Sequence, residues 1–377
     1  MTVHRNDSQI ITEQALRFIH DPVARTNKLC RTDEEHEAVT VLTLHKLAKR
    51  LLEATAHDFH VRSPMVKYLI SHAKPPIRFH EIFSQHKISP YAELYQEFFC
   101  NIRQSPAWNE RHMESSIGSR RLNLIKQQAL AMRKKFASAD FKKGLKAIQR
   151  SVNKNRQNLL EYFNELFARD KTLLILRLNI GYSEEEYQRQ SHRALLAQQH
   201  GWNPLLTADG NPSISNRPGL MPCQLPGLSL QDVVLHREEL IRHLRTTLKQ
   251  KLRGYAWKLD YTQYKGYQYH LVIFLDPALA NADLPCAQQI GKHWEEVVTQ
   301  GHGLCYDHHE VKKSYRFCAT GVKSHADPDL SDDLAKVADY LTRPDLYMQL
   351  VLPDKHRTLG KGGIKTKSET KAPRDRK

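Results

Sequence analysis

The chain has 377 residues, and its 57 lysines and arginines against 41 acidic residues give a net charge of +16 at pH 7. The sequence has no run of about 18 apolar residues and no signal-peptide pattern, which argues against a membrane span, so we expect a cytoplasmic protein. The positive charge favours a polyanionic partner, nucleic acid first, because clustered Lys and Arg gain affinity for phosphates by releasing counterions.

The first part of the chain, residues 1–165, is predicted to be a basic helical region. Apolar residues recur near helical spacing in residues 33–56. Residues 120–150 hold ten Lys or Arg and a single acid, Asp140. This stretch is a candidate DNA-binding surface, although a solvated helix face explains the same pattern. The candidate DNA contacts here are Arg120, Arg121, Arg133, Lys134, Lys135, Lys142 and Lys143.

The second part, residues 170–353, has a mixed pattern of strands and helices. Residues 171–182 form an apolar run typical of a buried strand, and residues 257–276 hold two apolar runs around a polar turn, typical of a β-hairpin. Helical patterns occupy residues 183–201, 229–252, 286–301 and 331–343. This order predicts an α+β domain on an antiparallel or mixed sheet.

The last part of the chain, residues 354–377, is basic and contains glycines, so it is predicted to be a disordered tail. Its Arg357 and Lys361 are further candidate DNA contacts.

Three polar residues interrupt the apolar strands of the predicted hairpin. Side chains alternate along a strand, so Gln268 and His270 point to one face. A turn centred near Tyr264 places Asp260 opposite Gln268, and opposed residues share a face. A carboxylate, an amide oxygen and an imidazole suit Mg²⁺ or Mn²⁺. A hydrogen-bonded histidine in the core is the competing interpretation.

The segment "VADYLTRPDLY" places Tyr340 and Arg343 three positions apart, on one side of a predicted helix. A tyrosine oxygen can attack a phosphodiester, and a neighbouring guanidinium can hold the phosphate oxygens. A tyrosine that packs at the rim of the core gives the same local pattern.

The order of these segments resembles the YagK/YfjJ C-terminal-domain family, which includes inovirus-type replication proteins. The resemblance rests on "LLILRLNIGY", "GYAWKLDYTQYKGYQYHLVIFLD", "IGKHWEEVVTQGHG", "VADYLTRPDLY" and "RTLGKGG", within roughly residues 170–365. The chain is also similar to the wider group of HUH endonucleases, whose second motif is His-hydrophobic-His and whose third is Tyr-x-x-Lys.

The resemblance implies a ferredoxin-like sheet with flanking helices and rolling-circle initiation. In such a reaction a divalent ion assists a tyrosine, which cuts one DNA strand and keeps its 5′ phosphate, while the freed 3′-OH primes synthesis. His270 matches the second histidine, Asp260 the acid, Tyr340 the nucleophile and Arg343 the lysine. Gln268 stands where the family usually has its first histidine, and an amide is a weaker ligand than imidazole for transition metals.

We therefore expect a replication initiation protein of a phage or mobile element, which nicks single-stranded DNA at an origin. Host replication proteins are further candidate partners. The alternative is a catalytically silent DNA-binding protein in which Gln268 has inactivated an inherited site. An RNA- or protein-binding accessory factor is a third interpretation.

Overall fold

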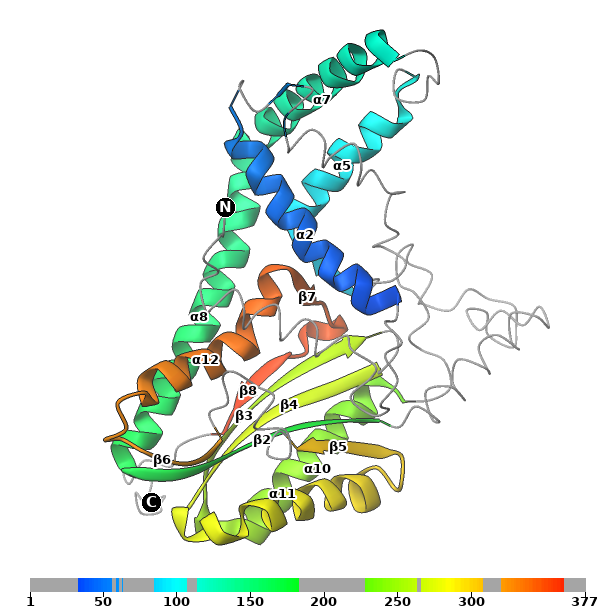
Figure 1. The fold of residues 1–377 in the computed structure, drawn as a ribbon. Coiled ribbons are helices and arrows are strands. Elements are labelled where there is room, and N and C mark those ends of the chain that lie inside the picture. The colour runs from blue at the N-terminus through cyan, green and yellow to red at the C-terminus, as the bar shows by residue number, and fades with distance from the viewer. Residues whose placement is uncertain are drawn as a thin grey trace, which may run out of the picture.

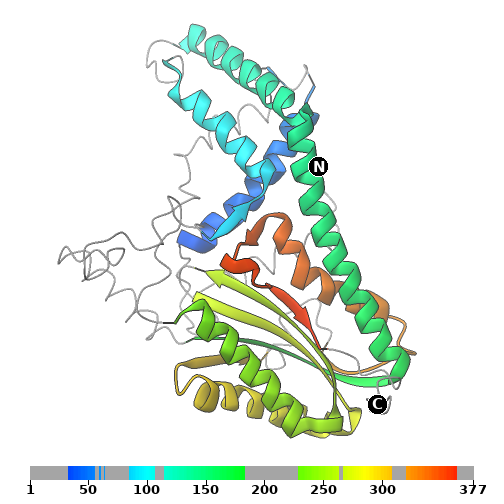
Figure 2. The same cartoon turned by 180° about the vertical axis from the view of Figure 1, so that it is seen from behind.

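The protein, described here by a computed structural model, is an α+β protein in which helices pack on an antiparallel sheet (Figures 1 and 2). The described residues are 33–55, 59–60, 63, 85–106, 114–182, 228–262, 266–307 and 320–362. Of the helices in these ranges, none is both long enough and apolar enough to cross a membrane.

The described residues of the N-terminal region lie mainly in helices. Helices α2 (Asp33–Glu53), α5 (Pro90–Gln104) and α7 (Glu114–Ala137) share one hydrophobic core. Helix α5 begins with Pro90 in its first turn, where proline is well tolerated, and its buried residues recur every three or four positions. They are Tyr91, Ala92, Leu94, Tyr95, Phe98, Phe99 and Ile102.

Helix α8 (Ala139–Arg169) connects this region to the sheet, and Figures 1 and 2 show it running along the length of the molecule. Its N-cap Ser138 accepts a hydrogen bond from the backbone N–H of Phe141. Phe141 packs against the N-terminal core, whereas Phe163 and Phe167 are buried against the sheet. The boundary expected near residues 165–170 therefore falls at the end of a helix that belongs to both parts.

The sheet has the strand order β5-β2-β4-β3-β8, and a further strand, β6, also pairs with β2. The strands are β2 (Thr172–Tyr182), β3 (Leu252–Thr262), β4 (Gly266–Leu275), β5 (Gly303–Asp307), β6 (Gly321–Ser324) and β8 (Leu359–Lys361). Every pairing is antiparallel. Strands β3 and β4 form the predicted hairpin, in which Asp260 lies opposite Gln268 as expected.

Helices cover both faces of the sheet (Figures 1 and 2). One face packs on α10 (Leu230–Leu248) and on α11 (Asp283–Lys292), which continues into the π-helical segment η5 (His293–Val298). The other face packs on α8 and on α12 (Leu330–Thr342), which is followed by the 3₁₀ segment η7 (Arg343–Leu346). The central strands β2, β3 and β4 are buried on both faces, which explains their nearly continuous apolar sequences.

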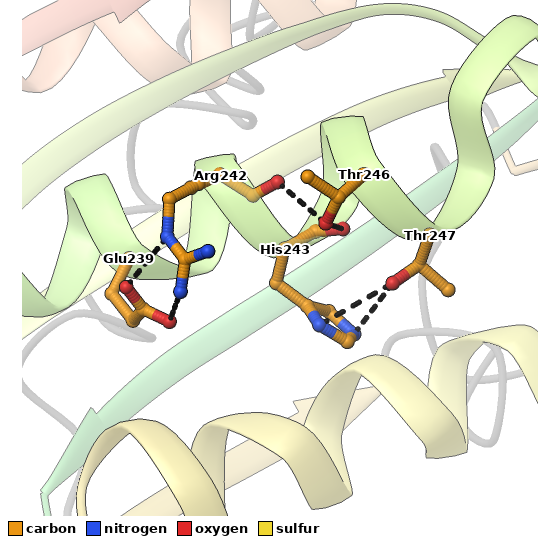
Figure 3. A network of polar contacts seen from close by, with 5 residues as sticks. All are labelled: Glu239, Arg242, His243, Thr246 and Thr247. Atoms are coloured by element: carbon orange, nitrogen blue, oxygen red, sulfur yellow. Dashed lines mark hydrogen bonds and ion pairs between the residues drawn. The ribbon is translucent and has the colours of Figure 1, made fainter.

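Helix α10 illustrates the amphipathic pattern. Ser229 and Asp232 form a capping box at its start, and Val233, Leu240 and Leu244 face the core. Its polar side carries an ion pair between Glu239 and Arg242, while His243 lies within hydrogen-bond distance of Thr247 (Figure 3).

The structure bears on the segment after residue 353, which was expected to be a tail. Part of the tail expected to be disordered is ordered, because Leu359–Lys361 pair with β3 as strand β8; residues 363–377 lie outside the described residues. The helix predicted for residues 183–201 lies outside the described residues. A second, two-stranded sheet joins β1 (His86–Ile88) of the N-terminal region to β7 (Met348–Leu350), just beyond η7.

Candidate active site

Polar residues gather on the face of the sheet that packs on α8 and α12. This face is apolar at one end, where Ile175, Ala256 and Val272 contact the helices. Two residues further along each strand the side chains become polar while remaining buried. They are Arg177 and Asn179 in β2, Lys258 and Asp260 in β3, and Gln268 and His270 in β4. Buried polar groups are costly unless they are paired, so their concentration at one place marks a candidate site.

His270 occupies the centre of this group because β4 lies between β2 and β3. The strand register places Asn179 on one side of it and Lys258 on the other. Its Nδ1 lies 2.7 Å from Oδ1 of Asn179, and its Nε2 lies 3.2 Å from Oδ2 of Asp260. Only 2% of His270 is exposed, so these neighbours fix the orientation of its ring.

Tyr340 reaches the same histidine from α12. Its hydroxyl oxygen lies 3.2 Å from Nδ1 of His270, and the two rings meet edge to face with centroids 5.5 Å apart. The guanidinium carbon of Arg177 lies 4.6 Å from the centre of the tyrosine ring, which is a cation–π distance. The two residues that the sequence singled out as nucleophile and ligand are 70 positions apart, and the fold brings them into contact.

Arg343 lies about one helical turn beyond Tyr340, and its guanidinium forms an ion pair with Asp339. Its Nε lies 2.7 Å from Oδ1 of Asp339, and Nε of Arg156 in α8 lies 2.5 Å from the same oxygen. Asp339 is almost completely buried, whereas the side chain of Arg343 is 31% exposed. Two guanidinium groups on one carboxylate leave an excess positive charge next to the tyrosine.

Lys258 adds a buried positive charge on the other side of His270. Its Nζ lies 2.8 and 3.0 Å from the two carboxylate oxygens of Asp345 in η7, and 3.9 Å from Oδ1 of Asp260. Burial lowers the pKa of the Lys258 ammonium, but the two carboxylates outweigh burial and hold this pKa above its ordinary value. Burial raises the pKa of Asp260, yet Lys258 and His270 together lower it to about 2. Both groups are therefore charged at neutral pH.

The three expected metal ligands, Asp260, Gln268 and His270, share one face as predicted. An ion bound to Asp260 would however lie near the Lys258 ammonium, and at about 4 Å and an effective dielectric constant of 20 their repulsion is about 8 kcal/mol. In the described part of the chain, no group of three His, Cys, Asp or Glu side chains is placed to hold a metal ion. The residues therefore fit a divalent ion poorly while Lys258 is charged, and the expected Mg²⁺ or Mn²⁺ stays a prediction that binding measurements must test.

Among the candidate DNA contacts, Arg133, Lys135 and Lys361 also bond to other parts of the protein, although Lys135 and Lys361 are exposed. Arg133 lies inside the N-terminal region, where its guanidinium hydrogen-bonds to the carbonyls of Leu51 and Ala54 at the end of α2. Lys135 pairs with Glu97. Lys361 donates to the carbonyl of Asn158 in α8 at 2.8 Å. The side chains of Arg120, Lys134, Lys142, Lys143 and Arg357 are exposed, and that of Arg121 is half-buried.

Sequence reasoning missed several residues of the site: Arg156, Arg177, Asn179, Lys258, Asp339 and Asp345. A signal was present for the two in β2, because "LRLNI" places an arginine and an asparagine two positions apart in an otherwise apolar strand. Lys258 carries the same signal two positions before Asp260. No local pattern indicated Asp345, because its role depends on the packing of η7 against β3.

Comparisons of the chain with protein-family models, with curated proteins and with solved structures found no match. A functional assignment therefore depends on these side chains and their geometry.

Proposed function

We propose that this protein is a DNA strand transferase that initiates replication of a phage or mobile element, with Tyr340 as the nucleophile. The observation that carries the proposal is the 3.2 Å contact between the Tyr340 hydroxyl and Nδ1 of His270, with Asp260 at the other ring nitrogen. A nucleophile, a base and a carboxylate that orients the base form the arrangement by which enzymes activate weak hydroxyl nucleophiles.

The proton has a defined path in this arrangement. The Asp260 carboxylate favours the tautomer of His270 that carries its hydrogen on Nε2, which leaves Nδ1 able to accept the tyrosine proton. Asn179 Oδ1 lies 2.7 Å from the same Nδ1, so Nδ1 accepts the tyrosine proton only when the Asn179 amide turns away from it.

The reaction that follows is an exchange of one phosphodiester for another. The Tyr340 oxygen bonds to phosphorus as its proton passes to His270, the bond from phosphorus to the 3′ oxygen breaks, and the proton is returned to that oxygen. The 5′ phosphate then remains on the tyrosine and a free 3′-OH is available to a polymerase. Arg343 and Arg156 next to Tyr340 would stabilise the charge that develops on the phosphate oxygens.

The fold supports the same assignment. Helix α10 lies between β2 and β3 in the chain, and α11 lies between β4 and β5. The resulting strand–helix–strand, strand–helix–strand order, with β2 and β4 at the centre, is the order expected of a ferredoxin-like sheet and so supports the proposal. The resemblance to HUH endonucleases implies this sheet, with the histidine on a central strand.

Helix α8 offers a path for DNA toward the tyrosine. Lys142, Lys146, Arg150 and Lys154 are exposed and recur every four residues, which is about 6 Å along the helix axis. Arg156 lies two residues beyond Lys154 on another side of the helix and shares Asp339 with Arg343, so DNA bound along the four residues would turn around α8 to reach the tyrosine. If these four residues bind phosphates of single-stranded DNA, replacing them by Ala should reduce the slope of log K against log salt by about 3.

The proposal is tested by incubating the protein with single-stranded oligonucleotides that cover the origin of its own genetic element. We expect a covalent protein–DNA adduct that resists detergent, and we expect Tyr340→Phe to abolish it without affecting stability or non-covalent binding. Tyr347→Phe is the matched control, because Tyr347 packs on His45 of α2, away from the contacts around His270. An adduct that disappears in Tyr347→Phe and persists in Tyr340→Phe would refute the assignment.

A catalytically silent DNA-binding protein is the second candidate, and the glutamine at position 268 favours it. DNA binding that depends on salt, without any adduct from the unmodified protein on its own origin, would support this function instead.

A further inference from the structure

Lys258 has no part in the proposed proton path, yet it is among the most deeply buried side chains of the protein. The hairpin register fixes it beside His270, and the turn after α12 brings Asp345 to its ammonium. Asp260 lies on the other side of the ammonium at 3.9 Å. A cation held between two carboxylates is an arrangement in which a divalent ion could otherwise be expected.

The charges of the site also suggest that the Lys258 ammonium lies where a divalent ion could bind. Burial raises the pKa of Asp345 and the Lys258 ammonium lowers it, whereas the pKa of Asp260 is held low. When both acids are ionised their two negative charges would match a divalent ion, and the ammonium reduces the total to one. Lys258 also links two parts of the site, because β3 carries Asp260 and η7 follows the helix that carries Tyr340. A fixed ammonium thus balances the acids and holds the end of the nucleophile helix against the sheet.

We infer that the Lys258 ammonium takes the place of a divalent metal ion in this site, so that the protein neither binds nor needs one there. Asp260, Asp345 and His270 are not placed to hold an ion as they stand, but both carboxylates face the Lys258 ammonium, so its removal should let Asp260 and Asp345 bind Mn²⁺ between them. The importance of the inference for catalysis rests on the proposed function, but ion binding can be measured without DNA and without turnover.

The test is a titration of the full chain with Mn²⁺, followed by electron paramagnetic resonance of the free ion and by thermal unfolding. The unmodified protein should bind no Mn²⁺ that depends on Asp260. Lys258→Met should bind one Mn²⁺ at least about 100-fold more tightly and should gain a Mn²⁺-dependent rise in Tm, because the repulsive charge is gone. Lys258→Met/Asp260→Asn should lose this gain.

A surface lysine provides the control. Lys292 pairs with Glu296 on an exposed helix face at 3.7 Å, and Lys292→Met should leave Mn²⁺ binding unchanged. Mn²⁺ binding by the unmodified chain tests the inference about Lys258 even if Lys258→Met does not fold. One bound Mn²⁺ that Asp260→Asn removes would overturn the inference, and so would a folded Lys258→Met variant with no increase in affinity.

The two proposals fail in different ways. If the strand-transfer proposal is wrong, no adduct forms under any condition, but the Mn²⁺ titration keeps its expected result. If only the inference about Lys258 is wrong, an adduct forms but requires added Mn²⁺ or Mg²⁺ and is prevented by EDTA.

Discussion

The two faces of the sheet are built from the same strands but differ in what they bury. The face that packs on α10 and α11 is apolar along its length, from Leu174 to Tyr182 in β2 and from Tyr267 to Leu275 in β4. The opposite face is apolar only at one end and then buries a lysine, an aspartate and a histidine. Because ionised groups lose hydration on burial, a face that serves stability alone would be expected to avoid them. The difference indicates that one face maintains the fold and the other maintains a site.

Neighbouring residues of β4 allow the sharpest comparison, because His270 and Leu271 point to opposite faces. His270→Gln keeps most of the volume but removes the base, so we expect the rate of adduct formation to fall by about 10²–10⁴. The free energy of unfolding should change much less than the rate. Single-turnover kinetics on folded protein measure the rate, and urea unfolding measures stability. If His270→Gln lost stability but kept its rate of adduct formation, the polar face would serve stability and not the reaction.

Leu271→Ala should have the opposite effect. Leu271 is buried among the apolar residues of the α10 and α11 face, so its truncation should lower the free energy of unfolding by about 2–5 kcal/mol. The folded fraction should form the adduct at an unchanged rate. Urea unfolding and an adduct assay normalised to folded protein check both statements, and a large loss of rate would contradict a purely structural face.

His45, a buried histidine outside the site, is expected to make the stability of the protein depend on pH. Burial and the charges of Lys49 and Lys46 lower the pKa of His45 to about 3, and its Nδ1 lies 2.6 Å from Oγ of Ser89. The folded pKa lies below the ordinary value, so the stabilisation is complete above about pH 6.5 and is lost as the pH falls. Between pH 6.5 and 5 we expect a loss of about 2 kcal/mol. His45→Gln should make the free energy of unfolding depend less on pH in this range. An equally steep dependence in the variant would show that His45 is not the group that titrates.

Adjacent residues of α7 give the smallest expected effects and test which basic residues serve structure. Arg133→Ala removes hydrogen bonds to carbonyls of α2 and should destabilise the protein by about 1–3 kcal/mol, with the salt dependence of DNA binding unchanged. Lys134→Ala, at an exposed position, should leave the free energy of unfolding within about 0.5 kcal/mol. Thermal unfolding and binding at several salt concentrations separate the two, and equal effects would show that burial does not distinguish them.

The sequence was sufficient where the pattern is local. Alternation along the hairpin predicted that Asp260 lies opposite Gln268, and helical spacing predicted a helix that carries Tyr340. The pairing of these elements was implied only by the resemblance to a family, because nothing local specifies which residue of a strand meets a helix 70 positions later.

The rest of the site depends on long-range register. Asn179 meets His270 because β2 pairs with β4 in one register, and a shift by one residue would direct it to the other face. The burial of Lys258 also depends on long-range contacts. A lysine in a strand is usually interpreted as an exposed residue, and the position of Asp345 explains how its charge is buried. The carbonyl partners of Arg133 come from another part of the chain and could not be predicted from local sequence, and its expected contact with DNA stays a prediction.

The most direct test of the account is to identify the tyrosine that carries DNA. The protein is reacted with single-stranded DNA from its own origin, the DNA is digested with nuclease, and the modified peptide is located by mass spectrometry. We predict a 5′-linked nucleotide on Tyr340, present in the unmodified protein and absent from His270→Gln at short reaction times. A nucleotide on Tyr347 or on another residue, or DNA binding without any modified peptide, would contradict the claim that the polar face of the sheet exists to activate Tyr340.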